Sequence, residues 1–477
     1  MCSINMLKFE NTYRDQLSKT FYSDQNPVPV SEPVVVILNK ELINELKLDT
    51  SFLHADYLSG NKTVVESTPI AQAYAGHQFG HFNMLGDGRA ILLGETITKT
   101  SRFDIQLKGS GQTKYSRRGD GRATLYSMLR EYLISEAMYF LGIPSTRSLS
   151  VVSFDDKIYR ETPSKGGVLT RVAQSHIRVG TFEYARALNS IDELNALTNY
   201  TIERHFPELV NTENKALKLL ETVMDLQIDL IVNWMRVGFI HGVMNTDNMS
   251  IPGETIDYGP CAFMNSYHPG TVFSSIDKDG RYAYGNQPHI GHWNLVVFAN
   301  SLLPIIDKDT QTATSKAQEV LDAFPKNYEK KYTAMMFSKL GIANHVPEDE
   351  TLIKEILQLL SKHQVDYTNF FTALRSQDFN GSPLNTDDEF IEWLKKWNVA
   401  HHRKGSAEEG LQLMKDNNPV VTPRNHLVEK ALTEAASGDM SSFNNLLKTL
   451  TKPYDTSLEN QSVPKGFDEQ YYTFCGT

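Results

Sequence analysis

Short apolar runs separated by turn residues dominate the first third of the chain. A β-branched run occupies residues 33–38, a second apolar run occupies residues 90–97, and residues 102–109 alternate strictly between apolar and polar side chains. Successive side chains of a strand point to opposite faces of its sheet, so the alternation separates the apolar residues from Lys108. The pattern predicts a β-sheet in which Lys108 points away from the apolar face.

A helical period follows over residues 123–141. Leucine and aromatic residues recur there at three- and four-residue spacing, and Gly142-Ile143-Pro144 ends the pattern. Three more strand-like segments lie between residues 148 and 173. A sheet interrupted by one long helix predicts an α+β protein, and this arrangement resembles the small lobe of a protein kinase.

From about residue 182 the apolar residues recur mostly at helical spacing, and this continues beyond residue 310. The exception is residues 249–257, where two short apolar segments flank a Pro-Gly-Glu turn. We expect a β-hairpin there that brings Asn248 and Asp257 close together. The predicted organisation is a sheet-containing region over residues 1–180, a mainly helical region over 181–310, and a helical extension with a polar tail over 311–477.

Composition and charge narrow the classes of function. The chain has 477 residues, 40% of them hydrophobic, which is typical of a folded protein with a sizeable core, and its formal net charge is −10. Such a charge argues against non-specific binding to nucleic acid or acidic membranes. No apolar run approaches the roughly 20 residues that span a bilayer, and residues 1–16 lack a signal-peptide pattern. We therefore expect a cytoplasmic protein with neither nucleic acid nor membrane as a partner.

One pentapeptide, Gly-Asp-Gly-Arg-Ala, occurs twice, at residues 86–90 and 119–123. Glycines let the backbone approach a ligand closely, and an adjacent arginine can bind phosphate oxygens, although two tight turns are an equally physical explanation. The second copy lies within residues 108–130, which hold six basic residues and one acidic residue. In a chain with net negative charge this reversal favours a phosphate site over a basic surface loop.

Arg171 and Arg178 lie seven residues apart where the strand pattern gives way to the helical pattern. If that junction forms a cleft, both guanidinium groups could bind a nucleotide's phosphates. A surface role is the alternative for both.

Residues 241–260, HGVMNTDNMSIPGETIDYGP, resemble a protein-kinase catalytic loop without its catalytic base. His241, Asn248 and Asp257 keep the positions of the kinase histidine and the two metal-binding residues, whereas Val243 stands where a kinase has its aspartate. The oxygens of Asn248 and Asp257 suit Mg²⁺ or Mn²⁺, and His241 is expected to fix the loop. Asp247 is the nearest carboxylate that could replace the missing base.

The segments AYAGHQFGHFNMLGDGRA, QLKGSGQTKYSRRGDGRATLYSMLREYLISEAMYFLGIPSTRSL, GGVLTRVAQSHIRVGTFEYA and HGVMNTDNMSIPGETIDYGP together resemble the selenoprotein O family, also called the YdiU family. The resemblance covers most of residues 70–300. It implies a two-lobed, protein-kinase-like fold that binds ATP in reversed orientation. It also implies transfer of AMP to Ser, Thr or Tyr of protein substrates with release of pyrophosphate, and transfer of UMP from UTP in some members.

The resemblance assigns roles to individual residues. Expected nucleotide contacts are Gly86, Gly88, Arg89, Lys108, Asp120, Gly121, Arg171, Arg178 and Asp257, with the two arginines on the deepest phosphates. Asn248 and Asp257 are expected to bind Mg²⁺ or Mn²⁺, and Asp247 to accept the proton. The family also pairs the strand lysine with a helix glutamate, which the REYL motif places at Glu131, although Glu136 is the one on the apolar stripe.

Two further expectations concern the cysteines and the reaction. Family members often end in cysteine or selenocysteine near Cys475, which suggests a redox-sensitive disulfide with Cys261. Besides adenylyl transfer, two alternatives remain open: a protein kinase that uses Asp247 as its base, and a non-catalytic nucleotide-binding scaffold, for which Val243 is the argument.

Overall fold

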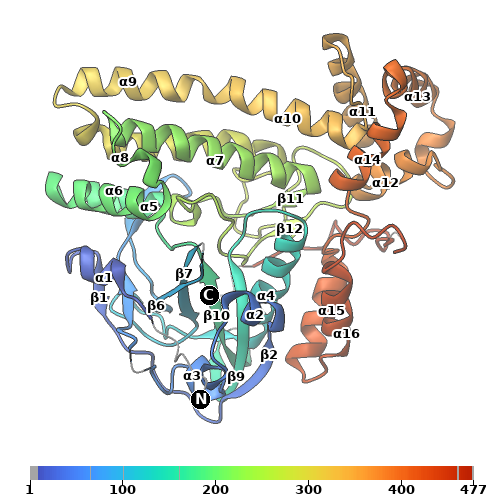
Figure 1. Ribbon diagram of the computed structural model, residues 1–477. Helices are drawn as coiled ribbons and strands as arrows, with labels where there is room; N and C mark the ends of the chain where they lie inside the picture. Colours follow the sequence, from blue (N-terminus) through green and yellow to red (C-terminus); the bar gives the residue numbers. More distant parts are fainter. Residues whose placement is uncertain (1–8, 65, 100, 161, 459–460, 475–477) are drawn as a thin grey trace.

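The computed structural model describes residues 9–64, 66–99, 101–160, 162–458 and 461–474, which form a mixed α+β structure (Figure 1). The strands are β1 (Tyr22–Asp24), β2 (Val34–Leu38), β3 (Ile70–Gln72), β4 (Ala75–Gln78), β5 (His81–Met84), β6 (Ala90–Ile97), β7 (Arg102–Lys108), β8 (Ala123–Thr124), β9 (Arg147–Tyr159), β10 (Pro163–Ala173), β11 (Phe239–Ile240) and β12 (Ala262–Phe263). The helices are α1 (Thr12–Gln16), α2 (Lys40–Leu46), α3 (Ala55–Leu58), α4 (Leu125–Phe140), α5 (Val179–Ala187), α6 (Ile191–His205), α7 (Lys215–Val237), α8 (Gln287–Ile306), α9 (Thr310–Asp322), α10 (Phe324–Leu340), α11 (Glu350–Lys362), α12 (Tyr367–Ser376), α13 (Asp388–His401), α14 (Ala407–Asn417), α15 (Asn425–Ala436) and α16 (Ser441–Leu450).

The main sheet has eight strands in the order β1-β3-β6-β7-β10-β9-β2, with β8 paired to β10. Its neighbouring strands pair in antiparallel fashion. The strands predicted at 33–38, 90–97 and 102–109 are confirmed as β2, β6 and β7, and β9 joins two of the predicted later segments into one long strand. The register places Lys108 opposite Leu169 of β10, at the end of the central strand β7.

Strand β7 separates an apolar layer from a polar one, as its alternation predicts. Ile105 and Leu107 lie in a hydrophobic cluster with side chains of α2 and α3. On the opposite face Asp104, Gln106 and Lys108 are also buried. Because buried polar groups need partners, this second face must contain a network of polar contacts.

Helix α4 confirms the helix predicted over residues 123–141. The hydroxyl of Thr124 accepts a hydrogen bond from Ser127 N (3.2 Å), which caps the first turn, and Gly142 in the left-handed conformation (φ 75°) follows its end. The helix packs against β9 and β10. It thereby carries its acidic side chains to the polar face of the sheet.

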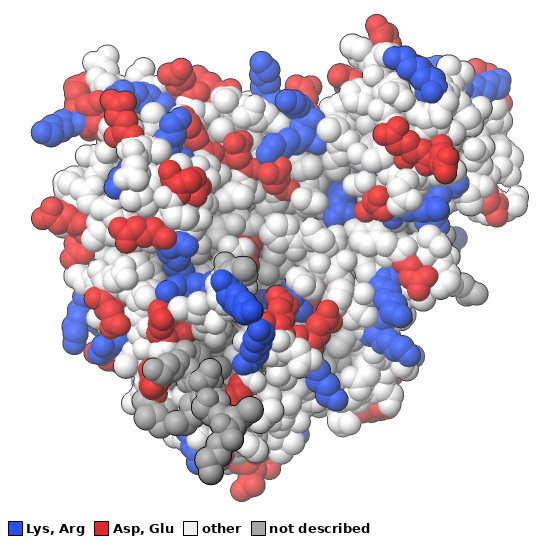
Figure 2. Space-filling model, in the orientation of Figure 1, with Lys and Arg blue, Asp and Glu red and all other residues white. Residues whose placement is uncertain are grey.

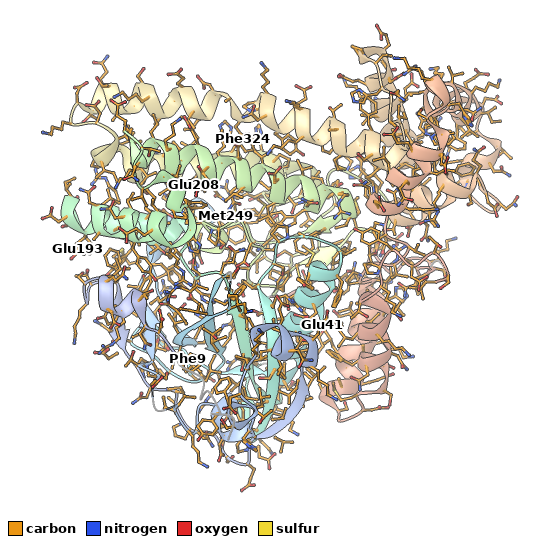
Figure 3. The ribbon with its side chains drawn as sticks, in the orientation of Figure 1. Phe9, Glu41, Glu193, Glu208, Met249 and Phe324 are labelled. Atoms are coloured by element: carbon orange, nitrogen blue, oxygen red, sulfur yellow. The ribbon has the colours of Figure 1, made fainter. Side chains whose placement is uncertain are left out.

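The helices α7, α8, α9 and α10 lie above the sheet in Figure 1 and pack against one another. Side chains fill the space between these helices and the sheet, including that of Met249, which is buried in the interior (Figure 3). The hairpin predicted around Pro252 is wrong. No two strands pair within residues 249–257. Ser250 instead forms an isolated bridge with Arg178, and Thr255 forms one with Ser145. Other segments of the same chain therefore form hydrogen bonds with the backbone groups that a hairpin would use.

The C-terminal helices return to the sheet side of the molecule. Helices α15 and α16 pack against each other and against α4 (Figure 1). The first described segment and the last helices therefore lie in the same half of the structure.

Basic and acidic side chains are interspersed over the face shown in Figure 2. No helix in the described part of the chain combines the length and the apolar composition needed to cross a membrane.

Candidate active site

A cavity of about 350 Å³ lies where the sheet meets the helical half. Lys108 enters it from β7, Arg171 from β10, and residues 85–90 and 115–122 form one of its walls. The loop after β11 supplies the opposite wall. All the predicted nucleotide-binding, metal-binding and catalytic residues line this cavity: Gly86, Gly88, Arg89, Lys108, Asp120, Gly121, Arg171, Arg178, Asp247, Asn248 and Asp257.

Four charged side chains meet at the base of the cavity, three of them buried and the fourth, Asp257, half-buried. Lys108 Nζ lies 2.5 Å from Glu131 Oε2 and also donates to Asp257 Oδ1. Arg171 binds Glu131 Oε1 through Nε (2.8 Å) and Nη2 (2.5 Å), and its Nη2 lies 3.8 Å from Asp257 Oδ1. The structure thus contains the ion pair predicted for Glu131. The surface role considered for Arg171 is wrong, because its side chain is buried.

The surrounding charges favour the ionised forms of Glu131 and Asp257. Burial alone would raise the pKa of Glu131, but Arg171 and Lys108 outweigh it and hold that pKa below its ordinary value. Burial opposes ionisation of Asp257 in the same way, and the nearby cations hold the pKa of that group well below its usual range. Ion pairs therefore hold the positive and negative groups of the site in fixed positions.

Arg178 connects the sheet to the catalytic loop. Its side chain is buried, its Nη1 donates to Asp247 O (3.4 Å), and its Nη2 lies 3.6 Å from Asp87 Oδ1. The guanidinium also lies over the ring of Tyr74, 4.3 Å from the centroid. The surface role considered for this arginine is also wrong.

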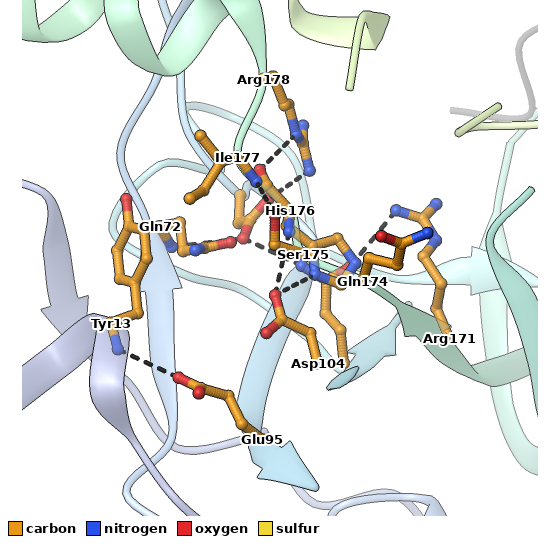
Figure 4. A network of polar contacts seen from close by, with 12 residues as sticks. Tyr13, Gln72, Glu95, Asp104, Arg171, Gln174, Ser175, His176, Ile177 and Arg178 are labelled. Atoms are coloured by element: carbon orange, nitrogen blue, oxygen red, sulfur yellow. Dashed lines mark hydrogen bonds and ion pairs between the residues drawn. The ribbon is translucent and has the colours of Figure 1, made fainter. Parts of the chain in front are cut away.

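A buried polar network fixes the segment that precedes Arg178 (Figure 4). Asp104 Oδ2 accepts hydrogen bonds from His176 N (3.0 Å) and His176 Nδ1 (2.9 Å), and Arg204 Nη2 lies 2.6 Å from Asp104 Oδ1. The carbonyl of His176 then accepts from Arg178 Nε (3.2 Å). Burial would raise the pKa of Asp104, but its partners lower it to about 2. Sequence reasoning missed this network, and the polar face of β7 was its only signal.

The two Gly-Asp-Gly-Arg-Ala copies have different surroundings. Gly86 has φ 152°, and a Cβ added there would lie 2.3 Å from the ring of Tyr115, so only glycine fits. Thr113 Oγ1 donates to Asp87 O (2.6 Å), which joins the first loop to the segment before the second. Asp87 is buried beside Arg178, as described above.

The second copy lies closer to solvent. Asp120 forms an ion pair with Arg160 (2.9 Å), and its side chain is 46% exposed. Gly121 has φ 67°, and an added Cβ would lie 2.1 Å from Gly111 O. The predicted residues Asp120 and Gly121 line the cavity, but these contacts show that both also hold the loop in shape.

His241 fixes the catalytic loop, as expected. Its Nε2 donates to Ile256 O (3.0 Å), and its Nδ1 accepts from Val243 N (3.4 Å). Burial lowers the pKa of the ring, which agrees with the single protonated nitrogen that this arrangement needs. Val243 is buried in the hydrophobic core and takes no part in the cavity.

The predicted base, Asp247, lies in a buried environment. Its Oδ1 is buried and has no hydrogen-bond partner within the described part of the chain. Burial raises the pKa of Asp247 to about 6, against the opposing effect of Arg178. A carboxylate with a pKa near the operating pH is suited to taking a proton from a substrate.

The hairpin of β4 and β5 covers Asp247, which the sequence did not reveal. His77 N donates to Thr246 Oγ1 (2.7 Å) and Phe79 N donates to Asn245 Oδ1 (3.0 Å). At Gly76 an added Cβ would lie 2.5 Å from Asp247 Oδ1. The glycines of the AGHQFGH segment were the available signal, since a glycine can mark a close approach.

Asn248 and Asp257 fit a divalent cation with few protein ligands. Asn248 Nδ2 donates to Val243 O (3.1 Å), which leaves its side-chain oxygen available for a ligand. Asp257 has φ 69°, an uncommon conformation for a residue other than glycine that often marks a functional site. Among the described residues no group of three or more His, Cys, Asp or Glu could hold a metal, so phosphate and water would complete the coordination of Mg²⁺ or Mn²⁺.

Cys261 is buried, and its Sγ lies 3.6 Å from Tyr258 O. Burial raises the pKa of this thiol to about 12, so it is a poor nucleophile in this environment. Cys475 lies outside the described residues, and its disulfide with Cys261 stays a prediction.

Comparison with known proteins agrees with the geometry. A family model described as "Protein adenylyltransferase SelO" matches residues 3–451. A protein from Pelagibacter ubique named protein nucleotidyltransferase YdiU is 52% identical over 478 residues, covering 98% of this chain and 99% of the relative. Relatives with the same name from Bacillus cytotoxicus and Clostridium beijerinckii are each 52% identical over 479 residues, covering 98% of this chain and 97% and 98% of their own chains.

Proposed function

The chain belongs to the protein adenylyltransferase SelO family, and from that premise we propose that it transfers AMP from ATP to hydroxyl groups of protein substrates and releases pyrophosphate. The acceptors are Ser, Thr or Tyr side chains, and UTP is a second donor. The fold is that of a two-lobed protein kinase, with the main sheet and α4 in the smaller lobe. The cytoplasmic location expected from the sequence stays a prediction.

One observation carries the proposal: a cavity lined by seven basic side chains is also lined by Asp247, a carboxylate of raised pKa, while the kinase base position is the buried Val243. The basic residues are Arg89, Lys108, Arg117, Arg122, Arg160, Arg171 and Arg178. They suit a triphosphate, and Asp247 suits a hydroxyl acceptor. Together they support a transfer reaction between a nucleotide and a hydroxyl group.

In the proposed reaction the acceptor oxygen attacks the α-phosphorus, and the bond from that phosphorus to the bridging oxygen of pyrophosphate breaks. Asp247 takes the hydroxyl proton. Arg171 and Arg178 bind the leaving pyrophosphate and stabilise the charge that develops on it. A divalent cation held by Asn248 and Asp257 would neutralise phosphate charge when bound.

Two alternatives predict different products. A kinase that uses Asp247 as its base would transfer the γ-phosphoryl group, and a scaffold would bind nucleotide without transfer. Incubating the protein and acceptor proteins with Mg²⁺ or Mn²⁺ and ATP labelled at the α- or γ-phosphate separates them. We expect covalent label from the α position; label from γ alone would mean a kinase, and binding without label would mean a scaffold.

The role of Asp247 is tested by Asp247→Ala. Loss of the base should lower the transfer rate by about 10²- to 10⁴-fold while leaving the Kd for ATP within about twofold of the wild-type value. The rate is followed by incorporation of α-label and the Kd by calorimetry. Unchanged turnover would rule out the assignment.

A further inference from the structure

Arg130 of α4 lies next to Glu131 but does not line the cavity. Its side chain is buried and binds the turn that follows Asp257: Nε donates to Gly259 O (3.1 Å) and Nη2 donates to Cys261 O (2.6 Å). A single guanidinium therefore connects the helix that carries the lysine's partner to the turn that carries the predicted metal ligand.

The C-terminal part of the chain holds this arginine from its other side. Glu429 of α15 accepts from Arg130 Nη1 (3.1 Å), and it also accepts from the hydroxyls of Tyr126 and Tyr471, the latter at 2.9 Å. Tyr471 OH lies 3.4 Å from Arg130 Nη2. These groups come from three separate parts of the sequence and are buried or half-buried.

Thr473 reaches the same turn directly. Its Oγ1 donates to Pro260 O (2.6 Å), and its side chain is buried. Its backbone is fixed as well, because Thr473 N donates to Phe273 O (2.8 Å) and Ser275 N donates to Thr473 O (2.9 Å). The carbonyls of three successive residues, 259, 260 and 261, are thus bound by Arg130 or Thr473.

We propose that the C-terminal segment positions the metal-binding turn of the active site, with Arg130, Glu429, Tyr471 and Thr473 as positioning residues. These contacts hold the turn in which Asp257 has φ 69°, an uncommon conformation for a residue other than glycine. The inference rests on the proposed function for the role of Asp257, whereas the contacts themselves do not depend on it.

The structure also provides a matched control. Tyr454 is another tyrosine of the C-terminal part whose hydroxyl contacts a buried arginine, Arg236 (2.5 Å), and donates to a backbone oxygen, Leu141 O (2.8 Å). Neither Arg236 nor Leu141 lines the cavity or contacts the turn at Asp257. Tyr454→Phe therefore removes a comparable set of contacts away from the site.

The test compares Tyr471→Phe combined with Thr473→Val against Tyr454→Phe, in the full-length protein. We expect faster amide hydrogen exchange in the peptide spanning residues 257–263 of the double variant, without nucleotide or metal. We also expect a rise of at least fivefold in the Mg²⁺ concentration that gives half-maximal α-label transfer, and a fall in kcat at little change in KM for ATP. Tyr454→Phe should change none of these three quantities, even if it lowers the thermal midpoint.

Thr473→Ser keeps the hydroxyl, so the variant that combines it with Tyr471→Phe should need less Mg²⁺ than the variant that combines Tyr471→Phe with Thr473→Val. If the peptide at residues 257–263 exchanges as in the wild-type protein, or the control variant shifts the Mg²⁺ requirement equally, the positioning role is wrong. If the wild-type protein transfers no α-label at all, the proposed function fails, and the hydrogen-exchange comparison still decides whether the C-terminal segment holds the turn.

Discussion

Replacing Gly76 by alanine should displace the carboxylate of Asp247, the proposed base, without changing its chemistry. Gly76 lies in β4 with backbone angles that alanine can adopt, so the only obstacle is the added methyl group, 2.5 Å from Asp247 Oδ1 and 3.0 Å from its Cβ and Cγ. Ordinary contact begins at 3.4 Å, so the carboxylate or the hairpin must move by about 1 Å. A misplacement of about 1 Å can lower a rate by about 100-fold.

We expect Gly76→Ala to lower kcat for α-label transfer by about 100-fold while the Kd for ATP changes little. Transfer is measured under saturating ATP and metal, and binding by calorimetry on the same preparation. Gly270→Ala is the control, because its methyl group would meet only the end of the flexible His268 side chain. If Gly76→Ala melts like the wild-type protein and also transfers label at the wild-type rate, the reasoning is wrong. Either Asp247 is not the base, or the β4–β5 hairpin moves away without displacing its carboxylate.

Three further substitutions test individual acidic residues, two at the base of the cavity and one elsewhere in the interior. Asp257→Ala should abolish α-label transfer at any Mg²⁺ concentration, since it removes a proposed metal ligand, and transfer restored by excess metal would contradict that role. Glu131→Gln should lower the free energy of unfolding by about 3–5 kcal/mol in urea titrations, because Lys108 and Arg171 lose a buried counter-charge; a change near zero would refute this. Glu254 is buried, and burial raises its pKa from 4.5 to about 8, so its contribution to stability is present below pH 4.5 and is lost as the pH rises to about 8. Glu254→Gln should therefore be more stable than the wild type by on the order of 3 kcal/mol at pH 7 and by little at pH 5, and a difference independent of pH would exclude this titration.

Local patterns were sufficient for the elements that form the framework. The strict alternation of residues 102–109 predicted both the strand and the side of the sheet on which Lys108 lies, and Gly142 marked the end of α4. Each of these features depends on backbone preferences within a few residues, so a single sequence is enough to find them.

The helical wheel was less informative for the partner of Lys108. It placed Glu136 on the apolar stripe, and that residue instead binds Arg147 Nη2 (2.7 Å), whereas Glu131 binds Lys108. Helix α4 is buried on most of its surface between the sheet and the C-terminal helices, so an apolar stripe does not distinguish its sides. The family motif predicted Glu131 correctly because it pairs the strand lysine directly with that glutamate.

Contacts between distant segments could not be predicted. Gly76 and Asp247 are separated by more than 160 residues, and Arg130 and Tyr471 by 341. No periodicity connects such positions. The wrong hairpin at residues 249–257 has the same origin, because its backbone groups form hydrogen bonds with residues 177 and 179 and with residues 144 and 146, which are far away in the sequence.

The packing of α15 and α16 on α4 has a consequence for how the protein is made. On the ribosome α4 emerges nearly 300 residues before α15 does. Synthesis proceeds at about 5–20 residues per second, so the outer face of α4 stays uncovered for on the order of 15–60 s before α15 and α16 are made. During that time the nascent chain exposes an apolar helix surface, and a chaperone that shields such surfaces would raise the yield of folded protein.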